Sequence, residues 1–120
     1  MTPKIQNTRF GSITIDGKEY DHDVMIRLDG EVKKRKKKAS KKIYGTSHKM
    51  SKDEAKIIYE KGADQVIIGN GQMGVLKLSS EAEKYFANKE CQVFISRTPR
   101  AIEKWNEANG KTIGVFHVTC

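Results

Sequence analysis

The second half of the sequence alternates between helical and strand periodicity, and this order restricts the fold more than any other feature. Helical patterns that begin at positions 51, 80 and 98 alternate with strand patterns over 65–69, 91–96 and 111–120. Strands that are separated by single helices are joined by right-handed crossovers into a parallel sheet. The sequence therefore predicts a parallel sheet flanked by helices in this half of the chain.

The ends of the three helices carry capping signals. Ser51 with Glu54, and Ser80 with Glu83, have the spacing of capping boxes, and Gly62 is expected to end the first helix. Thr98 is expected to cap the third helix, because a proline follows it at the first helical position, where proline is best tolerated.

The N-terminal half has strand character. Residues 9–29 predict two strands, and the dipeptides 16–17 and 29–30 are both Asp-Gly, a hairpin-turn signal. The segment that follows is expected to form a third antiparallel strand, or the arm of a long hairpin, as far as about Tyr44. Together the halves predict one α/β domain over residues 1–120, with a mixed sheet that begins as an antiparallel meander.

Composition limits the class of protein. The chain has 120 residues, 37% of them hydrophobic, which suits one compact domain. No run of 18 apolar residues is present, and Met1 to Phe10 is too polar for the core of a signal peptide. Two cysteines make no disulfide framework. We therefore expect a cytoplasmic protein that does not associate with membranes.

The net charge of +8 comes from one segment. Outside it, 15 cationic side chains balance 15 acidic ones. A strand here would direct cations to both faces, so we expect the segment to be solvated, and Tyr44 is the only aromatic residue nearby on which a base could stack. Weak, sequence-independent binding of nucleic acid is expected, and evolved recognition is the alternative. The candidate polyanion-binding residues are Lys33, Lys34, Arg35, Lys36, Lys37, Lys38, Lys41 and Lys42.

A second candidate site lies where parallel strands end, because ligands of open parallel sheets bind outside the carboxyl ends of the strands. A glycine loop, the start of the third helix and the final residues should meet there. Glycines let backbone amides approach an anion, and a helix start adds free amides. The other interpretation is a tight turn and a helix cap. The candidate ligand-binding residues are Gly69, Asn70, Gly71, Gly74, Arg97, Thr98, His117 and Cys120.

The sequence indicates no metal, cofactor or catalytic residue. His22 and His48 have no partner at metal-ligand spacing, and Cys91 and Cys120 lie 29 positions apart. His117 is interpreted either as a general base or, preferably, as a histidine whose hydrogen bonds are satisfied in the core.

The segments "FGSITIDGKEYDHDVMIRLDGEV", "SHKMSKDEA", "VIIGNGQMG", "TPRAIEKWNE" and the terminal "FHVTC" resemble the small Mth-nine-three-eight domain family. That family includes the vertebrate adipogenesis-associated protein and a mitochondrial assembly factor for respiratory complex I. The resemblance implies a mixed α/β fold, an assembly or regulatory role in some members, and no established catalysis. The family's loop usually reads Ile-Gly-Thr-Gly, whereas this chain has Asn70 in the third place. Its composition looks more like that of an archaeal member than of a mitochondrial one.

The leading hypothesis is a non-enzymatic protein that acts through an interface with an unidentified protein partner, as an assembly or regulatory factor. One alternative is a nucleic-acid-binding module that uses residues 33–42. The other is an enzyme or small-anion binder that uses the crevice at residues 69–74.

Overall fold

A computed structural model describes residues 2–120 and contains a five-stranded mixed sheet at its centre. The strand order is β5-β4-β10-β7-β9. Strands β10, β7 and β9 are parallel, and β4 and β5 add to them in antiparallel pairs. This arrangement confirms the predicted mixed α/β domain. The strands are β4 (Val24–Ile26), β5 (Val32–Lys34), β7 (Gln65–Asn70), β9 (Gln92–Ser96) and β10 (Thr112–His117).

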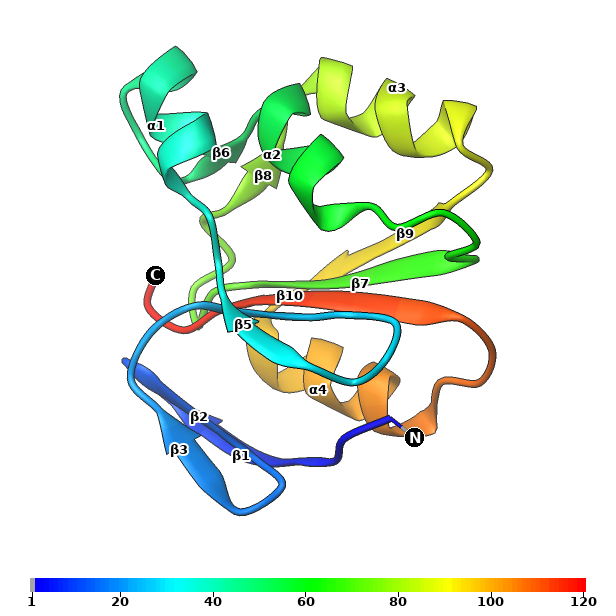
Figure 1. The fold of residues 1–120 in the computed structure, drawn as a ribbon. Coiled ribbons are helices and arrows are strands. Elements are labelled where there is room, and N and C mark those ends of the chain that lie inside the picture. The colour runs from blue at the N-terminus through cyan, green and yellow to red at the C-terminus, as the bar shows by residue number, and fades with distance from the viewer. Residues whose placement is uncertain (1) are drawn as a thin grey trace.

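Helices and a second sheet cover the two faces of this central sheet (Figure 1). One face carries α2 (Lys52–Ile58) and α3 (Ser80–Asn88). The other face carries α4 (Thr98–Glu107) and a three-stranded antiparallel sheet of β1 (Ile5–Arg9), β2 (Ser12–Ile15) and β3 (Lys18–Tyr20). On the same side as α2 and α3, near the end of the central sheet where β7 and β10 end, lie α1 (Lys38–Tyr44) and the short parallel pair of β6 (Lys49–Met50) and β8 (Lys77–Leu78).

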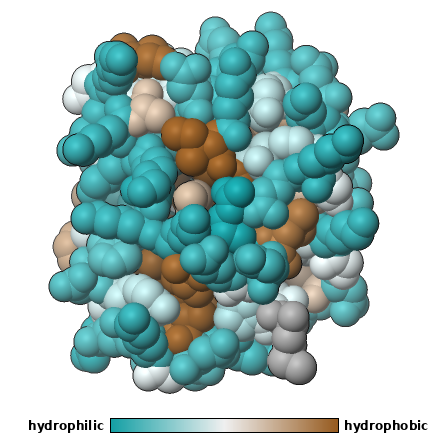
Figure 2. All heavy atoms as spheres, viewed as in Figure 1, coloured by the Kyte–Doolittle hydropathy of each residue, from teal (hydrophilic) through white to brown (hydrophobic). Residues whose placement is uncertain are grey.

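The two layers enclose separate apolar clusters. Phe86 is fully buried between the sheet and the α2–α3 layer, and Trp105 meets Phe116 edge to face, with ring centroids 5.9 Å apart, on the α4 side. The visible surface in Figure 2 is mostly hydrophilic, with separate apolar patches. Within residues 2–120, no helix has the length and apolar character needed to cross a membrane.

The N-terminal half differs from the prediction in the number and extent of its strands. The structure has two strands that were not predicted. Strand β1 pairs with β2, and strand β3, which follows the turn at Asp16-Gly17, pairs with the other side of β2. Both turn residues have positive φ angles, 48° and 81°, as the hairpin signal requires. The predicted third strand ends at Lys34, and the rest of the basic segment turns into α1, because Arg35 points into the protein interior.

The helix ends were predicted in part. Ser51 is the N-cap of α2, as expected, but this helix ends at Ile58, before Gly62. The N-cap of α3 is Ser79 instead of Ser80, and its hydroxyl accepts the Ala82 amide at 3.0 Å. Thr98 lies inside α4, one residue after the N-cap, because its hydroxyl bonds to two other segments of the chain.

Candidate functional site: a buried ion-pair network beneath a basic face

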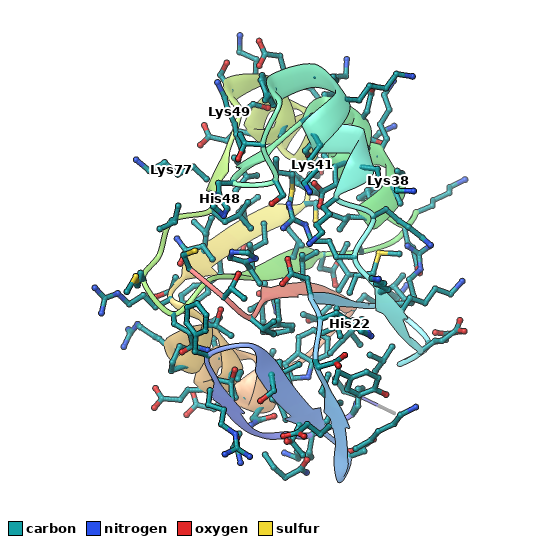
Figure 3. The ribbon with its side chains drawn as sticks, turned by 90° about the vertical axis from the view of Figure 1, so that its left-hand side faces the viewer. His22, Lys38, Lys41, His48, Lys49 and Lys77 are labelled. Atoms are coloured by element: carbon teal, nitrogen blue, oxygen red, sulfur yellow. The ribbon has the colours of Figure 1, made fainter. Side chains whose placement is uncertain are left out.

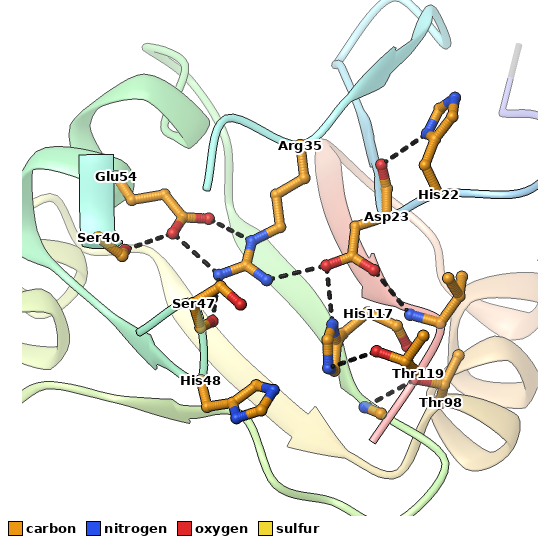
Figure 4. Close-up of polar contacts among 12 residues, drawn as sticks. His22, Asp23, Arg35, Ser40, Ser47, His48, Glu54, Thr98, His117 and Thr119 are labelled. Carbon is orange, nitrogen blue, oxygen red and sulfur yellow. Dashed lines mark hydrogen bonds and ion pairs between the residues drawn. The ribbon is translucent and has the colours of Figure 1, made fainter. Parts of the chain in front are cut away.

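A buried guanidinium, that of Arg35, joins the basic segment to the core (Figure 4). Its Nε donates to Glu54 Oε2 at 2.7 Å and its Nη2 to Glu54 Oε1 at 3.0 Å, so this pair is bidentate. Nη1 donates to Asp23 Oδ2 at 2.9 Å, and Nη2 also donates to the Ser47 carbonyl at 2.8 Å. Four hydrogen bonds from one side chain therefore hold the chain between β5 and α1.

The charges in this network compensate one another. Burial acts to lower the pKa of Arg35, but the hydrogen bonds and charges of Glu54 and Asp23 outweigh it and raise the pKa. The side chains of Arg35 and Glu54 are both fully buried. A buried ion pair of this kind adds little net stability over an apolar substitute, but the loss of one partner is strongly destabilising.

Asp23 connects Arg35 to the end of β10. Its carboxylate also accepts Nδ1–H of His117 at 2.7 Å and the Val118 amide at 2.9 Å. Burial alone would raise the pKa of Asp23, but the hydrogen bonds of His117 and Val118, and the charges of His117 and Arg35, lower it to about 2. Asp23 is therefore ionised at neutral pH, and its carboxylate accepts three hydrogen bonds from two segments of the chain, at residue 35 and at residues 117–118.

The basic segment is thus not wholly solvated, which corrects the sequence-based expectation. Arg35 is 3% exposed, whereas most of its cationic neighbours are exposed. The physical reason is that two carboxylates neutralise it, a possibility that the argument against burying an unpaired cation did not cover. The exposed candidates are Lys33, Lys34, Lys36, Lys38, Lys41 and Lys42, and Lys37 is partly exposed.

Ser40 joins the start of α1 to α2 and changes the expected capping box. The Glu54 amide donates to Ser51 Oγ at 3.1 Å, as the motif predicts. The Glu54 carboxylate, however, accepts from Ser40 and Arg35, and the Ser51 amide donates to Ser40 Oγ at 2.9 Å. Ser40 therefore takes the place of the Glu54 side chain in the motif, and the carboxylate is available for the ion pair.

The glycine loop, the start of α4 and the final residues meet as the sequence predicted. Thr98 links all three: its Oγ1 accepts the Gly71 amide at 2.9 Å and donates to the His117 carbonyl at 2.6 Å. Gly71 has φ of +106°, and a Cβ there would overlap the Cys120 backbone. Glycine is therefore required at this position by both conformation and close packing.

The loop amides that were expected to bind an anion already have acceptors. The Gln72 amide donates to the Thr119 carbonyl at 2.7 Å, and those of Met73 and Val75 donate to the Cys120 carbonyl at 3.2 and 3.1 Å. The Thr98 amide donates to the Gly71 carbonyl at 3.1 Å. An anion at this loop would have to displace these bonds, so the geometry favours a tight junction over an open anion site.

The other crevice candidates have different surroundings. Gly69 is buried, and a Cβ there would lie 2.9 Å from Thr98 Oγ1. Gly74 has φ of +71° and lies near Asn70, whose Oδ1 is buried and has no hydrogen-bond partner. Arg97 is exposed, and its Cγ lies 3.6 Å from the position that a Cβ at Gly74 would take.

His117 and Cys91 are both buried. His117 is 3% exposed, and its Nε2 lies 3.3 Å from Thr119 Oγ1. Asp23, His117 and Thr119 thus form a chain of carboxylate, imidazole and hydroxyl. A substrate could reach the buried imidazole only if the end of the chain moved. Burial and the nearby charge of Asp64 raise the pKa of Cys91 to about 11, so this thiol is protonated at neutral pH. Within residues 2–120, no three potential metal-ligating side chains converge on one point.

Above the network the cationic side chains form a face, which we call the basic face. It comprises the lysines of residues 33–42 with Lys49 and Lys77, and Figure 3 shows members from α1, β6 and β8 on one side of the protein. Lys49 and Lys77 are direct neighbours in the β6–β8 register. Lys49 also lies over the Tyr44 ring, 4.5 Å from its centroid. That ring is therefore already covered by a cation.

Comparison with known proteins identifies the family. The chain belongs to the family described as "Protein of unknown function (DUF498/DUF598)", whose model matches residues 5–117. It is 35% identical to the conserved hypothetical protein PH1505 from Pyrococcus horikoshii OT3, with a TM-score of 0.90 over 98% of this chain and 99% of that one.

Two further solved structures are similar. The protein named MT938 is 32% identical, with a TM-score of 0.85 over 99% of this chain and 100% of that one. A protein from Bordetella parapertussis shares only the fold, with 13% identity and a TM-score of 0.70 over 98% of this chain and 96% of that one. The similarity to MT938 agrees with the resemblance inferred from the sequence.

Sequence reasoning missed Asp23, Ser40 and Glu54 as partners of the basic segment. One signal was available: the segment contains one arginine among seven lysines. Arginine suits buried and bidentate pairs better than lysine does, because its guanidinium is planar and less strongly hydrated.

Proposed function

We propose that this protein is a non-enzymatic interaction factor that acts in the cytosol and binds an acidic partner protein through the basic face. The observation that carries the proposal is the anchoring of that face by Arg35. Its four hydrogen bonds hold the segment before α1 against Glu54 of α2, against Asp23 and against the Ser47 carbonyl. The lysines are therefore presented from a rigid frame, so less conformational entropy is lost on binding than from a mobile tail.

Charge supports an acidic partner. When Arg35 and its two carboxylates are set aside, 22 cationic side chains remain against 13 acidic ones. This excess would attract an acidic surface and speed association at low ionic strength. An assembly or regulatory role, which the family resemblance implies for some members, is compatible with such a surface.

A protein partner accounts for the face better than single-stranded nucleic acid does. Sequence-tolerant binding of single strands relies on aromatic rings on which bases stack. Tyr44, the aromatic residue of this segment, is partly buried and covered by Lys49. Duplex DNA requires only cations, and it is therefore the alternative that the experiment must separate.

The test compares two pairs of charge reversals with the same change in net charge. One variant carries Lys41→Glu and Lys77→Glu on the basic face. The control carries Lys61→Glu and Lys111→Glu, two lysines that line a separate pocket next to the start of β10. Fluorescence anisotropy measures binding of labelled polyglutamate. We expect the basic-face variant to weaken binding about tenfold and the control much less, since local charge dominates within a Debye length of about 8 Å at physiological salt.

Equal weakening by both variants would show that only net charge matters and would overturn the proposal. A duplex DNA arm covers the alternative. The slope of log affinity against log salt, near −0.9 per phosphate contact, gives the number of contacts. Submicromolar duplex binding that persists at physiological salt and exceeds polyglutamate binding would assign the face to nucleic acid.

A further inference from the structure

One edge of the central sheet lacks the features that usually protect such edges. Strand β9 pairs with β7 on one side and is the last strand in the sheet order. Its sequence, QVFIS, contains no charged residue and no proline. The opposite edge strand, β5, is shorter and ends in Lys33 and Lys34. Lysines and short strands discourage pairing of sheet edges, and β9 has neither protection.

The side chains of β9 are unusually exposed for apolar residues. Val93 is 37% exposed and Ile95 38% exposed, and both lie on one face of the strand. They line a groove of about 700 Å³ whose wall includes Leu78 and Ala87. Phe94 points to the opposite face, where it packs against the α4 cluster. The strand therefore has both a free backbone edge and an adjacent apolar groove.

We propose that two copies of this chain pair through β9 in antiparallel orientation, so that the two central sheets become one continuous sheet. A two-fold axis perpendicular to the sheet, centred on Phe94, gives the register. Val93 then lies opposite the partner's Ile95, and Gln92 lies opposite the partner's Ser96. Cross-strand pairs of β-branched residues stabilise antiparallel ladders, and the register forms two such pairs.

The charges at the two ends of β9 favour a second copy over other occupants. Glu90 precedes the strand and Arg97 follows it, and both are exposed. Antiparallel pairing brings Arg97 beside the start of the partner's strand, where the partner's Glu90 stands. The same attraction occurs twice because of the symmetry. The strand is thus complementary to itself in charge as well as in shape, as a two-fold interface requires.

The first test is the oligomeric state of the full chain in sedimentation velocity. We expect the wild type to dimerise at micromolar concentration and the variant Val93→Lys with Ile95→Lys to dimerise at least tenfold more weakly. The control, Ile43→Lys with Val75→Lys, adds the same charge at exposed apolar residues that lie outside β9. Circular dichroism checks that each variant is folded.

Exchanging the charges of Glu90 and Arg97 tests the antiparallel orientation of the two β9 strands, and it places no lysine within the strand itself. Arg97→Glu alone should weaken dimerisation, and the combination of Arg97→Glu with Glu90→Arg should restore it. The proposal is overturned if the wild type stays monomeric up to about 1 mM. A dissociation constant above that concentration corresponds to a free energy of association weaker than about 4 kcal/mol. A dimer that the β9 variants leave unchanged, or a swap that restores nothing, overturns it equally.

Discussion

Replacing Arg35 by methionine should destabilise the protein far more than replacing any exposed lysine of the same segment. Methionine is close in length but carries no charge and no donors, so Asp23 and Glu54 lose their shared partner inside the protein. The two carboxylates are 6% and 0% exposed. Without Arg35, the two carboxylates would either remain buried and negatively charged without their cation, or would bind protons.

The expected loss is about 3 to 5 kcal/mol, the usual effect of removing one partner of a buried ion pair. Domains of this size are stable by about 5 to 15 kcal/mol, so the variant keeps only part of its stability. Arg35→Lys should lose less, because the charge remains but the bidentate geometry does not. Lys36→Met, at the neighbouring exposed position, should change the stability by no more than about 0.5 kcal/mol.

Urea unfolding at pH 7, followed by far-UV circular dichroism, measures these differences directly. A double variant, Arg35→Met with Glu54→Gln, should lose less than the sum of the single losses, because it removes one uncompensated carboxylate. The reasoning is refuted if Arg35→Met lowers the free energy of unfolding by less than about 1 kcal/mol and so resembles Lys36→Met. A buried guanidinium that holds two carboxylates should contribute more to stability than an exposed lysine does.

Three other perturbations have definite outcomes. The pKa of Asp23 is lowered from 3.8 to about 2 in the folded protein. Ionised Asp23 therefore contributes about 2 kcal/mol to the free energy of unfolding above about pH 4, and this contribution is lost as the pH falls through about 2. Unfolding measured as a function of acid pH should show the loss in the wild type and not in Asp23→Asn. Thr98→Ala should cost about 1 to 3 kcal/mol in denaturant unfolding, because the Gly71 amide loses its acceptor, and Thr98→Ser should recover most of it. Cys91 should resist iodoacetamide at pH 7.5 in the folded protein and react in urea, because its thiol is buried and protonated; rapid alkylation of the native protein, read by mass spectrometry, would contradict this.

Patterns local in the sequence predicted most of the parallel half. The apolar run at 65–69 and the helix signals around it depend on neighbours a few positions apart, so the order of elements was correct. The predicted role of Thr98 as a cap was wrong because its hydrogen bonds go to Gly71 and His117, which are 27 and 19 positions away. A cap can be recognised from a tetrapeptide, whereas a bridge between three segments cannot.

The same distinction explains why the candidate site was only half predicted. The meeting of the glycine loop with the end of β10 follows from the topology of parallel strands. The ion-pair network does not, because Asp23 and His117 are 94 positions apart, the first just before β4 and the second at the end of β10. Neither hydrophobic periodicity nor a turn signal predicts a contact between residues so far apart in the sequence.

The position of β10 determines when this chain can fold during its synthesis. Strand β10 is the last element in sequence, yet it occupies the middle of the five-stranded sheet, between β4 and β7. Until residues 112–117 have been added, the backbone edges of β4 and β7 that pair with β10 have no partner in the sheet. Nascent chains with such exposed strands are prone to aggregate and engage chaperones. The chain can therefore complete this sheet only after residues 112–117 have been synthesised, when β10 inserts between β4 and β7.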